Sequence, residues 1–506
     1  MAVARNVIAN IAGTGVLVAT TAATTILSFR LAGAEQYGLI GFYLTLHSIV
    51  AMLDTGLGPG LVREVAHTRM GDQPHGLRTI LFTFQGIYAG ITILTTLVLI
   101  GASSFMSTWL SARTISPGEI QVALVLAALT VGLQRLRTVY SVFLEGLEQQ
   151  VLVNLLQGGT SIVRAIVVLG AMLLIAPTAI VFLAAMLLLI CAEVVVTAVF
   201  AWRSTRESGD PARFSRPMIH RLWRYLVTCS LAVAIGALLQ AADKFVVSAA
   251  LPLEVVGRYI FVSQICLIIL KLVAPNVTAI FPRLSASVRR DDAVETRRIY
   301  FVASQTVSCI VAIMTLGAVF FGSEALYILT GSWDIGRDYY LFFAILAAGY
   351  GLNSLCLIPN ALRRSEGDAA TALWGNGAAA LFYLPAIIIL TPVYGIMAPA
   401  WLWLAVNAAL LVLFAVRANR RILPAQSWSW LLACMIPQFA ATAAIFAVAR
   451  AALPQASSVL VVIPVVLLAT VIAMAASVAA SSELRLFALD VIRRWVSLPG
   501  SVSPAR

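Results

Sequence analysis

The stretch TAIVFLAAMLLLICAEVVVTAVFA at 178–201, followed by WRSTRESGDPARFSRPMIHR at 202–221, decides the fold class of this chain. Its first part is almost entirely apolar and, at more than about 20 residues, is long enough to cross a bilayer as a helix. Its second part is polar and rich in arginine, as connections on the cytoplasmic side of a membrane are. The same alternation continues along the whole chain, which is 61% hydrophobic with a mean hydropathy of +0.95. The sequence therefore predicts an all-α, polytopic membrane protein.

About fourteen apolar segments can each span the membrane at roughly 20 residues. They lie at 7–29, 38–62, 78–101, 119–144, 151–174, 178–201, 222–242, 255–280, 299–321, 338–361, 369–390, 395–416, 429–450 and 457–479. Arginines concentrate in every second connection. Because positively charged connections stay in the cytoplasm, we expect both termini there and an even number of spans. The net charge of +12 follows mainly from this pattern and favours anionic lipid as a neighbour, so no nucleic-acid partner is expected.

Five basic residues fall inside or at the edge of a predicted span instead of in a connection. They are Arg135, Arg137, Arg164, Lys244 and Lys271. The carboxylates in similar places are Asp54, Glu193 and Asp243. A charge in the hydrocarbon costs about 2.5–3.5 kcal/mol on insertion scales, so such residues normally face the protein interior or a wet cavity. The excess of buried bases predicts an anionic ligand.

Several predicted spans carry polar residues at helical spacing. One span aligns Gln157 with Arg164, another aligns Gln264 with Lys271, and the first span places Asn10 within a broad polar face. A lone polar residue in a span commonly joins two helices by a hydrogen bond. A polar stripe that ends in a charge favours a water-filled cavity instead.

Four further charged residues are candidates for gating or coupling. Asp54 is a carboxylate inside the predicted span at 38–62, and Asp243 is a carboxylate at the end of the span at 222–242. Asp243 lies beside a connection that must flex in alternating access, although capping a helix junction is the alternative role. Asp243 and Lys244 are sequence neighbours and are expected to point to different faces of their helix. Arg63 and Arg283 close two spans and are expected to flank the cytoplasmic mouth, with ordinary positive-inside anchoring as the alternative.

A weak internal repeat appears at an offset of roughly 220 residues. EQYGLI at 35–40 resembles EVVGRYI at 254–260, and Glu145-Gly146 resembles Glu366-Gly367. Repeats of six spans have the same orientation and are related by an axis along the membrane normal. We therefore predict two pseudo-symmetric six-helix lobes followed by two extra helices. Their bounds are an N-lobe at 1–206, a C-lobe at 207–424, and two additional helices with a cytoplasmic tail at 425–506.

Motifs of enzyme active sites are missing from the sequence. It contains no Walker loop and no HExxH, GxSxG or CxxC pattern, and no connection is large enough for a catalytic domain. All six cysteines fall inside predicted spans, so no disulfide framework is expected. We expect neither an enzyme nor a bound cofactor.

Four stretches resemble one known family: RLAGAEQYGLIGFY at 30–43, DTGLGPGLVREVA at 54–66, FLEGLEQQVLVNLL at 143–156, and LLQAADKFVVSAALPLEVVGRYIFV at 238–262. They are similar to the polysaccharide-export branch, including the O-antigen flippases, of the multidrug/oligosaccharidyl-lipid/polysaccharide flippase superfamily. The resemblance implies two lobes around a central cavity in the cytoplasmic (inner) membrane of a bacterium. It also implies translocation of a polyprenyl-diphosphate-linked oligosaccharide from the inner to the outer leaflet for O-antigen, capsule or exopolysaccharide export. Polymerase or chain-length components of a glycan assembly system would be partners, and the two extra spans resemble lipid II flippases, whose substrate is an alternative.

A cavity lined by arginine and lysine would neutralise a diphosphate, and amide side chains would bind the sugars. The substrate-binding candidates are Arg164, Lys271, Arg137, Lys244, Asn10, Gln157 and Gln264. We expect alternating access coupled to a Na⁺ or H⁺ gradient or to the membrane potential. A drug or organic-cation antiporter of the same superfamily is an alternative, but it would need buried carboxylates and few buried bases. A glycan polymerase or ligase is a second alternative, but it would need a large external loop.

Overall fold

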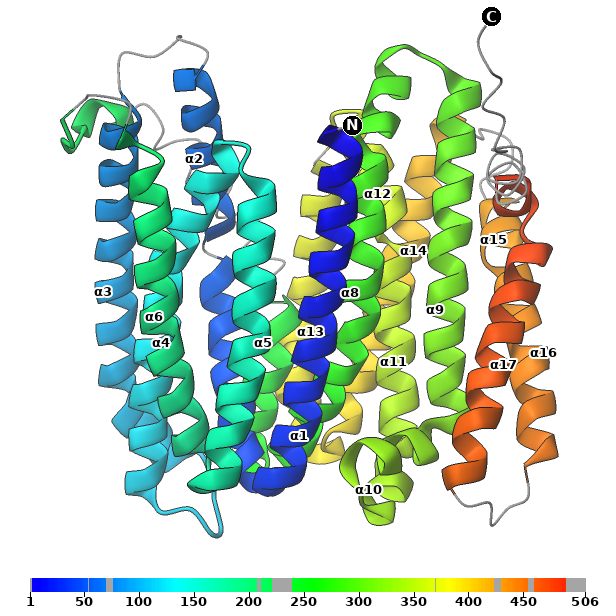
Figure 1. Cartoon of the computed structure of the whole chain (residues 1–506). Helices are drawn as coiled ribbons and strands as arrows, with labels where there is room; N and C mark the ends of the chain where they lie inside the picture. The colour runs from blue at the N-terminus through cyan, green and yellow to red at the C-terminus, as the bar shows by residue number, and fades with distance from the viewer. Residues whose placement is uncertain are drawn as a thin grey trace, which may run out of the picture. The chain divides into compact units, whose positions relative to one another are not determined.

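The computed structural model of the chain describes residues 2–52, 54–69, 76–206, 211–220, 239–368, 370–422, 429–453 and 459–487. Within these ranges all regular secondary structure is helical, which confirms the predicted all-α class (Figure 1). The helices are α1 (Ala2–Met52), α2 (Asp54–Arg69), α3 (Leu77–Trp109), α4 (Pro117–Gly146), α5 (Gln150–Leu174), α6 (Ala179–Arg203), α8 (Leu253–Arg289), α9 (Ala293–Thr330), α10 (Trp333–Asp338), α11 (Tyr340–Leu355), α12 (Leu357–Ser365), α13 (Ala370–Tyr394), α14 (Met397–Ile422), α15 (Ser429–Cys434), α16 (Ile436–Ala452) and α17 (Val459–Ala480).

Thirteen of the fourteen predicted spans overlap these helices of the described residues. Among the described residues, 12 helices are long and apolar enough to cross a membrane. One of them, Gly15–Ala51, contains a kink at Gly33 (φ 76°, ψ 172°) and covers parts of the first and second predicted spans. The predicted span at 222–242 lies mostly outside the described residues. A backbone with positive φ is accessible to glycine without steric cost, so Gly33 allows α1 to reverse direction between two spans.

The chain forms two compact units that interleave along the sequence. Unit 1 comprises Met1–Ile265 and Asn376–Pro399, and unit 2 comprises Cys266–Gly375 and Ala400–Arg506. The predicted boundaries after residues 206 and 424 fall in connections outside the described residues. The division into an N-lobe, a C-lobe and a C-terminal part therefore stays a prediction.

Each unit has its own packed interior. In unit 1, Leu61 on α2, Phe84 on α3 and Phe143 on α4 are fully buried in one cluster. In unit 2, Phe321 on α9 packs with Phe446 on α16. In a bilayer, lipid is as apolar as these side chains, so close packing and hydrogen bonds stabilise helix association more than removal from water does.

The order of the helices repeats along the chain, as the sequence predicted. The pairs α3 and α9, α4 and α11, α5 and α13, and α6 and α14 begin 216, 223, 220 and 218 residues apart. In the second half the counterpart of α4 is divided into α11 and α12 at Cys356.

A close contact between helices is also repeated. A Cβ atom on Gly132 of α4 would overlap the Thr96 hydroxyl of α3, and one on Gly351 of α11 would lie 2.6 Å from the Thr315 hydroxyl of α9. Both residues of the first pair lie 219 positions before their counterparts. Glycine at these positions leaves room for the threonine side chain of the neighbouring helix, so that the two helices can pack closely.

The turns after α4 and α12 show that the sequence alignment of Gly146 with Gly367 is shifted by two residues. Glu148 has φ 61° and Gly367 has φ 86°, so each turn places one residue in the left-handed region. These residues are also 219 positions apart. Gly367 is therefore the counterpart of Glu148, and its expected counterpart Gly146 still belongs to α4.

Repeat-equivalent segments of α1 and α8 contact each other within unit 1. A Cβ on Gly38 would lie 2.7 Å from the carbonyl oxygen of Leu253, and a Cβ on Gly257 would overlap the carbonyl oxygen of Ala34. Gly38 and Gly257 are equivalent at the offset of 219, and so are Ala34 and Leu253. Each glycine thus contacts the residue four positions before the other glycine. This reciprocal pattern is expected for two repeats that meet across a local pseudo-twofold axis.

The last two spans pack on α9, and α16 and α17 lie side by side in orange and red (Figure 1). Their interface contains buried polar side chains as well as apolar ones. The amide of Gln438 on α16 donates to the Ser481 hydroxyl (2.8 Å), and the amide of Gln305 on α9 donates to the Ser482 hydroxyl (3.2 Å). These hydrogen bonds attach the additional helices to unit 2.

Candidate functional site

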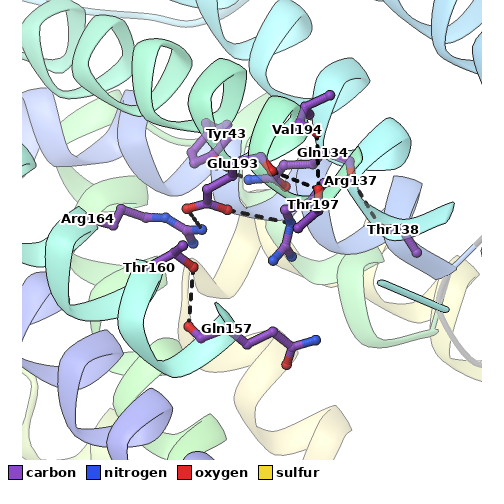
Figure 2. A network of polar contacts seen from close by, with 10 residues as sticks. All are labelled: Tyr43, Gln134, Arg137, Thr138, Gln157, Thr160, Arg164, Glu193, Val194 and Thr197. Atoms are coloured by element: carbon purple, nitrogen blue, oxygen red, sulfur yellow. Dashed lines mark hydrogen bonds and ion pairs between the residues drawn. The ribbon is translucent and has the colours of Figure 1, made fainter. Parts of the chain in front are cut away.

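Three neighbouring helices of unit 1 bring three charged side chains together inside the predicted spans. Arg137 comes from α4, Arg164 from α5 and Glu193 from α6, and Figure 2 shows both arginines directed at the carboxylate. Nη2 of Arg164 lies 2.5 Å from Oε1 of Glu193, and Nε of Arg137 lies 3.6 Å from Oε2. We call these three residues the charge cluster. With two guanidinium groups and one carboxylate it has a net charge of +1.

Helical spacing explains how the side chains reach this place. Gln157 and Arg164 are seven residues apart on α5, so they lie on the same face, as the sequence predicted. Thr197 follows Glu193 by one turn of α6, and its hydroxyl donates to the Glu193 carbonyl oxygen (2.7 Å). Hydroxyls that bind the backbone of their own helix are satisfied without a partner on another helix.

A small hollow adjoins the charge cluster. It has a free volume of about 10 Å³, which is room for about one water molecule. The residues that line it are the polar Arg137, Ser141, Gln157, Thr160, Glu193 and Thr197 and the apolar Leu156 and Val196. The hollow therefore offers donors from two helices, α4 and α5, beside the carboxylate of a third, α6.

The arginines of the charge cluster are not saturated by Glu193. The side chain of Glu193 is 5% exposed, whereas those of Arg137 and Arg164 are 24% and 22% exposed. Among the described residues, Nε of Arg137, Nε of Arg164 and Oε2 of Glu193 have no hydrogen-bond partner. The 3.6 Å between Nε of Arg137 and Oε2 of Glu193 corresponds to an ion pair and is too long for a hydrogen bond. Donor capacity directed toward the cluster therefore remains for a further anion.

Tyr43 and Gln134 extend the polar network from the charge cluster toward α1. The Gln134 amide on α4 donates to the Tyr43 hydroxyl (3.1 Å), and both side chains are buried (Figure 2). The neighbouring Arg135 is 1% exposed and donates to the carbonyl oxygen of Val50. Arg135 thus binds the backbone of the C-terminal part of α1.

Asp243 and Lys244 form an ion pair, which contradicts the expectation that they point to different faces. Nζ of Lys244 lies 3.0 Å and 3.1 Å from the two carboxylate oxygens of Asp243 and 2.9 Å from the carbonyl oxygen of Gln240. The Tyr259 hydroxyl on α8 donates to Oδ2 of Asp243 (2.6 Å). The lysine side chain is long enough to fold back along its own helix, so adjacency in sequence did not separate the two charges.

Comparisons with known proteins identify the family of this chain. A model of the family described as "Polysaccharide biosynthesis protein" matches residues 3–288, which is more than half of the chain. The chain belongs to the polysaccharide biosynthesis protein family. A search of curated proteins found no significant match.

Three solved structures illustrate the fold of this polysaccharide biosynthesis protein. An inward-facing multidrug resistance transporter of the MATE family of the MOP superfamily has a TM-score of 0.65 at 14% identity, covering 81% of this chain and 95% of that one. The lipid II flippase MurJ in its inward closed conformation has a TM-score of 0.66 at 12% identity, covering 96% and 99%. A MOP superfamily transporter from Pyrococcus furiosus, whose binding pocket has reverse polarity, has a TM-score of 0.62 at 14% identity, covering 83% and 95%. At these identities the similarity establishes the fold.

The remaining candidates of this family member lie elsewhere. Lys271 and Gln264 are half-buried on α8, and Lys271 has no ion pair with any described residue. Arg63 on α2 and Arg283 on α8 are exposed. The side chains of Asn10 and Asp54 lie outside the described residues.

Glu193 is the residue of the charge cluster that sequence reasoning left out of the candidate site. It was identified as a carboxylate inside a span, and a charge in that position requires a partner. Spacing within α6 does not reveal which arginine on another helix meets it. The structure therefore groups Arg137, Arg164 and Gln157 from the candidates and adds Glu193 to them.

Proposed function

We propose that this protein is a flippase that moves a polyprenyl-diphosphate-linked oligosaccharide from the inner to the outer leaflet for polysaccharide export. Membership of the polysaccharide biosynthesis protein family and the fold shared with MOP superfamily transporters support this proposal. The observation that carries it is the charge cluster, which puts a net positive charge inside membrane-spanning helices. An anionic headgroup is the ligand that such a charge stabilises.

The chemistry of the headgroup matches the side chains of the site. Arg137 and Arg164 can bind phosphate oxygens through paired N–H groups, because a guanidinium presents its donors in one plane. Gln157 and Thr160 line the adjoining hollow and can hydrogen-bond to sugar hydroxyls. The polyprenyl tail can remain in the bilayer while the polar headgroup passes through the protein. No cofactor takes part in this scheme.

The membrane potential can drive this movement. A diphosphate with about two negative charges that moves outward across an inside-negative membrane releases about 4.6 kcal/mol per 100 mV, at about 2.3 kcal/mol per charge. We propose that the potential, or a Na⁺ or H⁺ gradient, supplies the energy. The location that fits is a bacterial cytoplasmic membrane with both termini inside, where glycan polymerases and chain-length components would be partners.

Export of organic cations is the second candidate and is less compatible with the site. A cation site in the same position would need an excess of carboxylates, whereas Glu193 is paired with two arginines. Lipid II is compatible with the site because it also carries a diphosphate and a polyprenyl tail. It differs in the glycan, so the glycan of the accepted substrate separates these two cases.

Reconstituted transport tests the proposal. Purified protein in proteoliposomes is given a fluorescent polyprenyl-diphosphate oligosaccharide, and appearance of the headgroup in the opposite leaflet is measured. Arg137→Ala and Arg164→Ala should each reduce transport about 10- to 150-fold, because a lost charge-assisted bond costs about 1.5–3 kcal/mol. Arg450→Ala is the matched control, since Arg450 is an exposed arginine whose partner is Glu324 on α9. Unchanged transport in both cluster variants, or uptake of cationic dyes in its place, would contradict the proposal.

A further inference from the structure

Glu193 occupies the position in the charge cluster that an anionic ligand would need. Its two carboxylate oxygens face Arg164 at 2.5 Å and Arg137 at 3.6 Å, from the side of α6. Phosphate oxygens bind arginine through the same N–H donors that a carboxylate uses. Glu193 and a bound diphosphate would therefore compete for the same two side chains.

The ion pairs with Glu193 hold both arginines in place but leave some of their N–H donors without a hydrogen-bond partner. Only Arg164 lies within hydrogen-bond distance of the carboxylate, and Nε of each arginine lacks a hydrogen-bond partner among the described residues. One carboxylate balances one of the two positive charges, whereas a diphosphate carries about two negative charges and more oxygens. The ligand thus gains more from the pair of arginines than Glu193 does.

The space beside the cluster shows that a ligand must displace part of it. The adjoining hollow holds about one water molecule, and a diphosphate is much larger. Arg137, Gln157 and Thr160 line the hollow and are suited to hold the ligand. Glu193 also lines it, but its negative charge opposes an anion there. The Glu193 side chain is therefore the group that has to withdraw.

We propose that Glu193 is a built-in competitor of the diphosphate headgroup. Its carboxylate holds Arg137 and Arg164 when no ligand is bound, and it displaces the headgroup from the two arginines during release. This inference rests on the proposed function of the charge cluster. A tethered carboxylate acts at a high effective concentration, so it can compete with a ligand that has more charge. Glu193 thereby limits affinity and keeps the headgroup from being trapped between the arginines.

Binding of inorganic pyrophosphate to the purified full-length protein in nanodiscs tests the inference. Titration calorimetry gives Kd, and the melting temperature with and without pyrophosphate gives a second readout. Glu193→Gln leaves two uncompensated arginines, so it should melt below the wild type without ligand. It should bind pyrophosphate about tenfold more tightly or better and gain more in melting temperature on binding. In proteoliposomes the same variant should release the headgroup more slowly.

Two further variants make the result specific. Glu324→Gln removes the carboxylate of a different arginine pair, with Arg450, and should leave Kd unchanged. Glu193→Asp keeps the charge but withdraws it by one methylene, so its affinity should lie between those of the wild type and Glu193→Gln. This variant also decides the question if Glu193→Gln does not insert stably, because equal or weaker binding by Glu193→Asp would then overturn the inference.

The outcomes separate this inference from the function on which it rests. Tighter binding by Glu193→Gln, lost in Arg164→Ala, supports both. If the wild type binds pyrophosphate through Arg164 but Glu193→Gln binds equally or more weakly, Glu193 is not a competitor and the flippase proposal stands. If neither the wild type nor any Glu193 variant binds pyrophosphate or a short polyprenyl diphosphate, the proposed role of the charge cluster fails as well.

Discussion

Replacing Gly257 by alanine tests the contact between α1 and α8 that joins the two repeats. The new Cβ would overlap the carbonyl oxygen of Ala34 and would lie 3.0 Å from the backbone nitrogen of Gly38. Both are backbone atoms, so no side chain can rotate away and the helices must separate. Overpacking of this kind costs typically about 1–3 kcal/mol. We expect Gly257→Ala to lie at the upper end of that range.

Two other glycines set the scale of the effect. Gly38→Ala should destabilise less, because its Cβ would lie 2.7 Å from the Leu253 carbonyl oxygen, a smaller overlap. Gly90 on α3 is exposed, and a Cβ added there would have no neighbouring atom within 4 Å, so Gly90→Ala should stabilise the helix by up to about 1 kcal/mol. The two kinds of glycine therefore predict changes of opposite sign.

Thermal unfolding of the purified variants in detergent, followed by size-exclusion chromatography after heating, gives their order. From the highest melting temperature to the lowest, the expected order is Gly90→Ala, wild type, Gly38→Ala and Gly257→Ala. A Gly257→Ala protein that melts with the wild type or above it would refute the close approach of α1 and α8. Destabilisation of Gly90→Ala by the same amount as Gly257→Ala would show that the effect comes from glycine in general and not from this contact.

Three further predictions concern charged residues. Arg164→Lys should recover only part of the transport lost in Arg164→Ala, measured in the same proteoliposomes, because a point charge cannot reproduce the planar guanidinium. Asp243→Asn should lower the melting temperature strongly, since removing one partner of a buried ion pair costs about 3–5 kcal/mol; Asp243→Asn combined with Lys244→Met should recover stability, and no recovery would argue against the pair. Hydrogen bonds from Thr371 and Arg363 hold the pKa of Asp368, between α12 and α13, below its usual range. A carboxyl group whose pKa is lowered in the folded state stabilises the fold at pH values above its ordinary pKa. The difference in melting temperature between wild type and Asp368→Asn should therefore be present at pH 7 and shrink as the pH falls below about 4. A difference that does not depend on pH would contradict this.

Much of the fold could be predicted because a bilayer imposes simple rules on the chain. Each apolar segment had to be a helix long enough to cross, and arginine had to collect on one side. The spans therefore match the helices closely, and the repeat was detectable from EQYG at 35–38 and EVVG at 254–257. The sequence did not determine the register of the repeat, because glycine and arginine are common at span ends. The left-handed conformations of Glu148 and Gly367 decided it.

The candidate site was only partly predictable. A charge inside a span has to face protein or a wet cavity, and the structure places the partly buried Arg137 and Arg164 beside Glu193. The sequence contains the carboxylate as well, but the pairing of Glu193 depends on how α4, α5 and α6 are rotated against each other. The ion pair of Asp243 with Lys244 likewise depends on side-chain conformation, which helical periodicity does not describe.

The sequence by itself determined the all-α membrane class of the protein, the order of the spans in the described part of the chain, and the excess of positive charge inside them. These properties follow from local transfer energies, which each segment has on its own. Only the tertiary structure decided that one carboxylate stands between two arginines, and that Gly38 and Gly257 bring repeat-equivalent segments into contact. Such pairings join residues far apart in the chain, so they arise from the packing of whole helices and from no single segment.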